Sequence, residues 1–138
     1  MHIFRYMNIC MKHTEPHLDA SFPAADAFAD HETPSPAMME QVAARFRVLG
    51  DVNRIRILAL LREGECAVGA LAQALEMGQA SVSKHLDRLR SVGMVHRRRE
   101  GVHHYFSIRD PTVHQLCAVM CGAVQKVAAE DHAALQVP

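Results

Sequence analysis

One histidine and two cysteines recur at helical spacing near the end of the chain, as His114, Cys117 and Cys121. On a helix these three side chains fall within an arc of about 60°, and successive Cβ atoms lie roughly 5–6 Å apart. Two thiolates and an imidazole suit a soft ion such as arsenite, antimonite, Cd²⁺ or Hg²⁺, whereas Zn²⁺ needs a fourth ligand, for example from a partner subunit. Cysteines that merely pack an interface between subunits explain the same residues equally well. The residues leave both interpretations open.

A second polar cluster occupies residues 79–90, with the sequence QASVSKHLDRLR. At a period of 3.6 residues, Val82, Leu86 and Leu89 share one helix face. The outward side chains are hydroxyls, amides and cations, which are the types that reach phosphates and base edges in a DNA groove. The residues expected to approach bases or adjacent phosphates are Gln79, Ser81, Ser83, Lys84 and His85.

Three consecutive arginines follow in a segment of different period. From residue 94 to 108 the apolar period changes from 3.6 to 2, and strands at 94–99 and 102–108 flank a compact turn at Glu100-Gly101, where glycine supplies a positive φ. Such a hairpin forms a wing that lies along the phosphate backbone or enters the minor groove. A solvated charged edge that discourages aggregation is the alternative for the arginines. The residues expected to make mainly phosphate contacts are Arg88, Arg97, Arg98, Arg99 and His104.

Helices must hold these groups in place. The apolar periodicity predicts a helix from Ser35-Pro36 to Leu49, a central one that begins at Asp51 or Asn53, and a short one at 67–75. Only three residues, 76–78, separate the short helix from the polar helix, which is the helix-turn-helix arrangement. A generic helical hairpin is the alternative. A last helix, from 112 to about 129, is apolar enough to bury itself against its copy in a dimer. The predicted fold is mainly α with a β-hairpin wing, a winged helix-turn-helix.

Composition sets the organisation of the chain. With 138 residues, 49% of them apolar, it predicts one domain at 36–130, preceded by a mobile proline- and histidine-containing arm at 1–35 with a short helix near 24–29, and followed by a frayed tail at 131–138. No apolar run approaches the ~20 residues of a membrane span, so we expect a cytoplasmic protein. The formal net charge is zero, yet residues 84–109 hold seven lysines and arginines against two acidic residues, which favours a polyanionic partner.

Several functions are disfavoured by the sequence. It contains no glycine-rich phosphate loop and no nucleophile elbow, so we expect no enzymatic activity. The four cysteines belong to a chain without a signal peptide, where structural disulfides are uncommon. A winged-helix domain that binds only protein is the remaining alternative to a DNA-binding regulator.

Residues 46–113 resemble the ArsR/SmtB family of bacterial winged-helix repressors. The resemblance rests on LGD-xx-R-xx-IL at the second helix, on Q-xx-V-S-K-H-L followed by LR-xx-G, and on the arginine-rich wing that ends in Y-F-S-I-x-D-P. It implies a homodimer, paired through its first and last helices, that binds a palindromic operator in double-stranded DNA. It also implies that an inducer releases the operator.

The known inducer sites of that family do not carry over. Where arsenic sensors of the family place a Cys-Val-Cys pair, this chain has Ala67 and Gly69. Zinc sensors place an Asp-x-His pair at the start of the last helix and a second histidine-containing pair further along. Here Asp110 matches, but the remaining positions are Thr112, Ala123 and Lys126. The candidate for an inducer site is therefore the face of His114, Cys117 and Cys121.

Reactive cysteines on the last helix of some family members imply a redox alternative at the same face. In that case Cys117 or Cys121 would sense persulfide or peroxide, with Cys66 as a resolving thiol. A regulator whose cysteines are purely structural is the further alternative.

Overall fold

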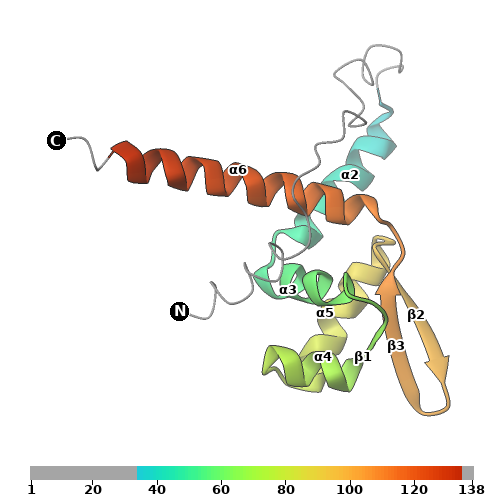
Figure 1. The fold of residues 1–138 in the computed structure, drawn as a ribbon. Coiled ribbons are helices and arrows are strands. Elements are labelled where there is room, and N and C mark those ends of the chain that lie inside the picture. Colours follow the sequence, from blue (N-terminus) through green and yellow to red (C-terminus); the bar gives the residue numbers. More distant parts are fainter. Residues whose placement is uncertain (1–33, 135–138) are drawn as a thin grey trace.

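The computed structural model describes residues 34–134. They form five helices and three strands: α2 (Pro36–Leu49), α3 (Val52–Leu61), β1 (Cys66–Ala67), α4 (Val68–Leu75), α5 (Gln79–Ser91), β2 (Val95–Glu100), β3 (His103–Ile108) and α6 (Thr112–Ala134). In Figure 1 the tip of the β2–β3 hairpin and the start of α6 lie at opposite ends of β3, and the far end of α6 stands clear of the other helices. Nearly all of the expected mobile arm, including its short helix, and the last four residues of the expected tail lie outside the described residues.

Side-chain caps begin the first two helices. The Ser35 hydroxyl accepts a hydrogen bond from the Met38 amide at 3.2 Å, and Pro36 occupies the first turn. Asp51 caps α3 by accepting from the amides of Asn53 and Arg54 at 2.9 and 3.1 Å. Of the two start positions that the sequence left open for α3, Asp51 is therefore the cap.

The core lies where α3, α4 and α5 meet the sheet. Ile57 and Leu58 of α3 are 0% and 1% exposed, which confirms the central position expected for this helix, although Ile55 on its other side remains exposed. Val95 of β2, Phe106 of β3 and Val113 of α6 close the cluster from the other elements. The sheet and the last helix are thus joined to the helix-turn-helix by shared apolar contacts.

The turn between α4 and α5 has the length that the sequence predicted, residues 76–78. Glu76 adopts a left-handed conformation with φ 54°, and its amide donates to the carbonyls of Ala72 and Gln73, which ends α4. Gly78 then precedes the first turn of α5. The two helices of the helix-turn-helix are set by this tight connection.

The wing differs from expectation in two respects. Glu100 pairs with His103, so the turn residues are Gly101 and Val102, one position later than expected, and Gly101 has φ 59°. The sheet also has a third strand, β1, in the order β1-β3-β2, with Cys66 opposite Phe106. A strand of two residues is too short to show a period, which is why the sequence pattern did not reveal it.

Helices α2 and α6 carry apolar side chains that the chain does not cover. Phe46 and Val42 on α2 and Met120 and Val124 on α6 are between 46% and 65% exposed. Helix α6 continues to Ala134, beyond the end expected near 129, because the alanine-rich stretch that follows favours helix. Among residues 34–134, no helix has the length and hydropathy needed to cross a membrane.

Candidate nucleic-acid interface

Helix α5 presents a polar front on a fully buried back. Val82, Leu86 and Leu89 are all 0% exposed, as the sequence predicted, and they fix the rotation of the helix about its axis. Of the predicted contact residues on this helix, Gln79, Ser81, Lys84 and Arg88 are exposed and Ser83 is half-buried. The front of α5 is therefore available to an external partner.

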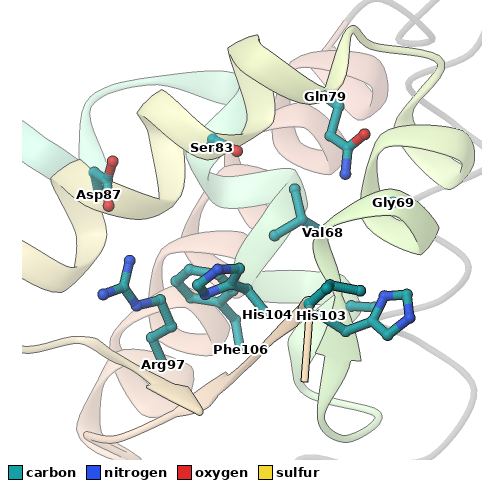
Figure 2. Close-up of a pocket in the computed structure, with 11 residues that line it drawn as sticks. Val68, Gly69, Gln79, Ser83, Asp87, Arg97, His103, His104 and Phe106 are labelled. Carbon is teal, nitrogen blue, oxygen red and sulfur yellow. The ribbon is translucent and has the colours of Figure 1, made fainter. Parts of the chain in front are cut away.

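A groove of about 280 Å³ runs between α5, the start of α4 and the wing. Four of the predicted DNA-contacting residues line it: Gln79 and Ser83 from α5, and Arg97 and His104 from the wing. In Figure 2 the guanidinium of Arg97 lies on the side of the groove near Asp87, the one acidic lining residue. Asp87 was not among the predicted site residues. The fold thus brings two stretches that are about twenty residues apart in sequence into one polar groove.

The three wing arginines divide between two faces of the sheet. In β2, successive side chains point to opposite faces, so Arg97 and Arg99 share one face and Arg98 lies on the other. Arg99 pairs with His104 across the hairpin, and its Nε donates to the Gly101 carbonyl at 3.0 Å. Because Arg97 and His104 line the groove, the Arg97 face is the one that continues the front of α5.

Arg98 is held by acidic and aromatic neighbours instead. Its Nη2 donates to Glu65 at 2.6 Å, its Nη1 donates to Glu100, and its guanidinium lies 4.8 Å from the centroid of the Tyr105 ring. The hydrogen bonds from Arg98 lower the pKa of Glu65, and the two carboxylates raise the pKa of Arg98 above its already high ordinary value. The expectation of a phosphate contact from Arg98 has no support in this arrangement. Glu65 gave no local sequence signal, because it lies 33 residues from Arg98.

His85 also lies away from the outward face of α5. Its Nδ1 is 3.7 Å from a carboxylate oxygen of Asp51, and its side chain is 18% exposed. The reason is its helical position, about 60° from Val82, which places it at the edge of the buried stripe. Burial opposes ionisation of Asp51, but the amides of Arg54 and Asn53 and the nearby charges of Arg54 and His85 outweigh it and lower the pKa of that carboxyl.

The three candidate sensing residues lie along the first part of α6. His114 and Cys117 are half-buried, Cys117 against the core, whereas Cys121 is exposed. Among residues 34–134 the structure contains no group of three or more His, Cys, Asp or Glu side chains that could hold a metal ion. The predicted triad is therefore not an assembled three-ligand site within the described part of one chain. Burial, followed by the charge of Arg62, lowers the pKa of His114 below its ordinary value.

A helix-turn-helix with a polar second helix, followed by a basic wing, defines the winged helix-turn-helix class of DNA-binding domains. Residues 51–97 match the family model described as bacterial regulatory protein, arsR family. The chain is 38% identical over 98 residues to the HTH-type transcriptional regulator Rv0324 of Mycobacterium tuberculosis, an alignment that spans 71% of this chain and 41% of that protein. It is 32% identical to the cadmium resistance regulator CadC of Listeria innocua, over 68% of this chain and 75% of CadC.

Among solved structures, the homodimeric winged helix-turn-helix domain Mb0332 of Mycobacterium bovis, a possible ArsR-family regulator, is 37% identical, with a TM-score of 0.57. That match covers 75% of this chain and 92% of the domain. The chain belongs to the ArsR family of bacterial transcriptional regulators. Membership confirms the predicted family, the predicted fold class and the prediction that the chain is not an enzyme.

Proposed function

We propose that this chain is a homodimeric repressor that binds a palindromic operator in double-stranded DNA, with α5 of each subunit in the major groove. The observation that carries the proposal is the uncovered front of α5, where Gln79, Ser81 and Lys84 are exposed above three fully buried residues. A helix fixed from behind and polar in front can approach base edges without disturbing its own packing. Such a repressor would act in the cytoplasm, where the operator DNA is.

The proposed contacts lie on two surfaces beside the groove, the outward face of α5 and the Arg97 face of the wing. Gln79, Ser81, Ser83 and Lys84 approach base edges or nearby phosphates. The residues proposed to contact mainly phosphates are Arg88, Arg97, Arg99 and His104. Arg98 and His85 are removed from the sequence-based set because each faces a carboxylate of its own chain.

Dimerisation is supported by the exposed apolar faces of α2 and α6. Phe46, Met120 and Val124 are each more than half exposed, and large apolar side chains left uncovered on two helices favour association. The similar Mycobacterium bovis domain is homodimeric. In a two-fold dimer the two α5 helices must lie ~34–36 Å apart to enter successive major-groove segments. The two-fold symmetry of the dimer makes the operator palindromic.

Salt dependence of DNA binding tests the proposal. We expect the affinity for DNA from the upstream region of the gene itself to fall steeply with salt, by about 0.9 log units per log unit of salt for each neutralised phosphate. Arg97→Gln and Arg88→Gln should each reduce that slope by about 1.8, because the homodimer loses one phosphate contact in each subunit. Lys126→Gln, an exposed charge on α6, is the matched control and should leave the slope unchanged. Weak binding that does not vary with salt would refute the repressor and favour a domain that binds only protein.

We further propose that a thiophilic ion or an oxidant acting at Cys117 and Cys121 releases the operator. Cys117 packs against the core and Cys121 is exposed on the same helix, so a ligand on both would alter how α6 sits on the domain. The similarity to CadC, a cadmium resistance regulator, supports a soft metal. Residues 34–134 of one chain assemble no three-ligand group. The ion would therefore bind Cys117 and Cys121, with His114 as a candidate third ligand of the same chain, and would take its remaining ligands from the partner subunit.

A gel shift screened against arsenite, antimonite, Cd²⁺, Zn²⁺, Hg²⁺, peroxide and polysulfide identifies the inducer. The Cys117→Ser, Cys121→Ser double variant should bind DNA as the unmodified protein does and should resist release. Cys66→Ser is the control for the redox alternative, because loss of release in that variant would indicate a resolving thiol. Release that persists in the double variant would exclude this site, and the absence of release by any agent would leave the cysteines purely structural.

A further inference from the structure

Arg98, Tyr105 and Glu65 form a row of side chains that runs from β2 across β3 to the residue just before β1. Tyr105 lies in the central strand, where its register partners are Arg98 of β2 and Ala67 of β1. The guanidinium of Arg98 lies over the Tyr105 ring and reaches Glu65, the residue that precedes β1. Its Nε donates to both oxygens of the Glu65 carboxylate at 3.2 Å and its Nη2 donates to one of them at 2.6 Å.

The far end of this row is the start of the helix-turn-helix. Glu65 is followed at once by β1 and α4, and α4 leads through its three-residue turn into α5. Backbone pairing between β1 and the wing involves only two residues of β1, and a two-stranded hairpin alone is marginally stable in water. A side-chain contact from the outer strand of the wing to Glu65 therefore adds a polar attachment between the wing and the reading helices, beside the β1 pairing and the apolar contacts of Val95 and Phe106.

The charge around Arg98 does not suit a DNA phosphate. Two carboxylates, from Glu65 and Glu100, contact one guanidinium, so the cluster is acidic overall. A phosphate that approached it would be repelled at short range, whereas the opposite face offers Arg97 and Arg99 without a salt bridge to any acidic residue in the described part of the chain. Multidentate hydrogen bonding and the stacked ring also give Arg98 a more defined geometry than a simple surface pair.

We propose that Arg98 is a positioning residue, which fixes the angle between the wing and α5 through Glu65 and Tyr105 and does not contact DNA. The proposal rests on the DNA-binding function above and refines it, because it restricts the phosphate contacts of β2 to Arg97 and Arg99. It makes the carboxylate of Glu65 part of the DNA-binding apparatus, although that carboxylate carries the same charge as the ligand.

Substitution of Glu65 changes DNA affinity in opposite directions for the two possible roles of Arg98, positioning of the wing and contact with phosphate. If Arg98 positions the wing, Glu65→Gln weakens DNA binding by about two- to fivefold, the range expected for loss of a well-formed exposed ion pair, and leaves the salt slope unchanged. If Arg98 instead contacts phosphate, Glu65→Gln frees the guanidinium of each subunit, strengthens binding and steepens the slope by about 1.8 for the homodimer. Arg98→Gln, which also removes the contacts with Tyr105 and Glu100, should weaken binding at least as much as Glu65→Gln. The Glu65→Gln, Arg98→Gln double variant should match Arg98→Gln, because Glu65 acts only through Arg98.

Amide hydrogen exchange of the free protein tests the contact between Arg98 and Glu65 without DNA. Both single variants should speed exchange in residues 95–108, and the double variant should match Arg98→Gln, while Arg97→Gln should leave exchange unchanged and reduce only the salt slope. Unchanged exchange in the Glu65 and Arg98 variants would overturn the positioning role, as would tighter DNA binding by Glu65→Gln. If the unsubstituted protein did not bind DNA, the repressor proposal would fail, and the exchange data would still decide whether Arg98 holds the wing.

Discussion

The two ends of the molecule treat their apolar side chains in opposite ways. At the DNA-reading end, the apolar face of α5 is closed by its own chain, so that Val82, Leu86 and Leu89 are fully buried. At the other end, α2 and α6 leave Phe46 56% exposed and Val124 65% exposed, among other apolar residues. Both stretches have helical apolar periodicity, so the pattern alone does not distinguish a face that packs within the chain from one that awaits a partner.

This difference separates folding from assembly. Burial of apolar area contributes about 25 cal/mol per Å², and the α5 face gains that free energy when a single chain folds. In the proposed dimer, the α2 and α6 faces gain it only when a second copy covers them. Substitutions at the first end should therefore appear as lost stability of the fold, and substitutions at the second as lost dimer, with DNA affinity falling in consequence.

The largest expected effect is on folding, at Leu86. Leu86→Ala removes a side chain that is 0% exposed between α5 and the rest of the core, and large-to-small changes at such positions cost about 2–5 kcal/mol. Urea unfolding followed by circular dichroism measures the loss. Arg88→Ala, two positions along on the exposed side of the same helix, should change the free energy of unfolding by no more than about 0.5 kcal/mol. Equal losses at the two positions would remove the distinction between back and front.

The next effect is on assembly, at Phe46 and Val124. The double substitution Phe46→Ser, Val124→Ser should raise the dimer dissociation constant at least about tenfold, because large apolar anchors dominate such interfaces. Sedimentation equilibrium measures the constant, and circular dichroism checks that the helices persist. Val102→Ser is the control, since Val102 is 84% exposed at the wing tip, far from the proposed interface. A dimer that survived the double substitution would place the interface elsewhere.

Local signals in the sequence were sufficient for much of the fold. The buried stripe of α5, the three-residue turn and the capped start of α2 depend on neighbours within a few residues, and each was predicted where it occurs. Strand β1 was not predicted, because its two residues pair with a strand about forty positions later in the sequence, with Cys66 opposite Phe106. The wing turn was misplaced by one residue because glycine fitted either position.

The candidate site was harder to predict for the same reason. Residue type correctly placed the polar front of α5, but it could not show that His85 meets Asp51 or that Arg98 meets Glu65, since those partners are distant in sequence. The alternation of side chains between the two faces of β2 follows from the strand period of two. Val95 is buried, so residues 97 and 99 lie on the same face as Val95. Because three arginines follow one another, the sequence did not show which of them lies on which face.

A smaller effect on stability is expected at Asp51, whose carboxylate caps α3 behind the reading helix. Asp51→Ala should cost about 1 kcal/mol of unfolding free energy, and Asp51→Asn, which can still cap, should cost less. The folded-state pKa of Asp51 is lowered, so its contribution is complete above the unfolded value of 3.8 and is lost as pH falls through the folded pKa. Chemical denaturation at neutral pH and in acid measures both effects. Equal losses for Ala and Asn would show that the charge, and not the cap, carries the contribution.

The smallest effect concerns His114, near the start of α6. This position lies between the core behind α5 and the exposed apolar face of α6. Burial and the charge of Arg62 lower its folded pKa below 6.5, so between these two values the unfolded chain binds more protons than the folded one. The neutral imidazole therefore contributes fully above 6.5, and its contribution declines as pH falls toward the folded pKa. Denaturation of the unsubstituted protein and of His114→Gln, from about pH 7.5 to about pH 5, should give free energies that converge as the pH falls. Parallel curves would mean that protonation of this side chain does not weaken the attachment of α6 to the core.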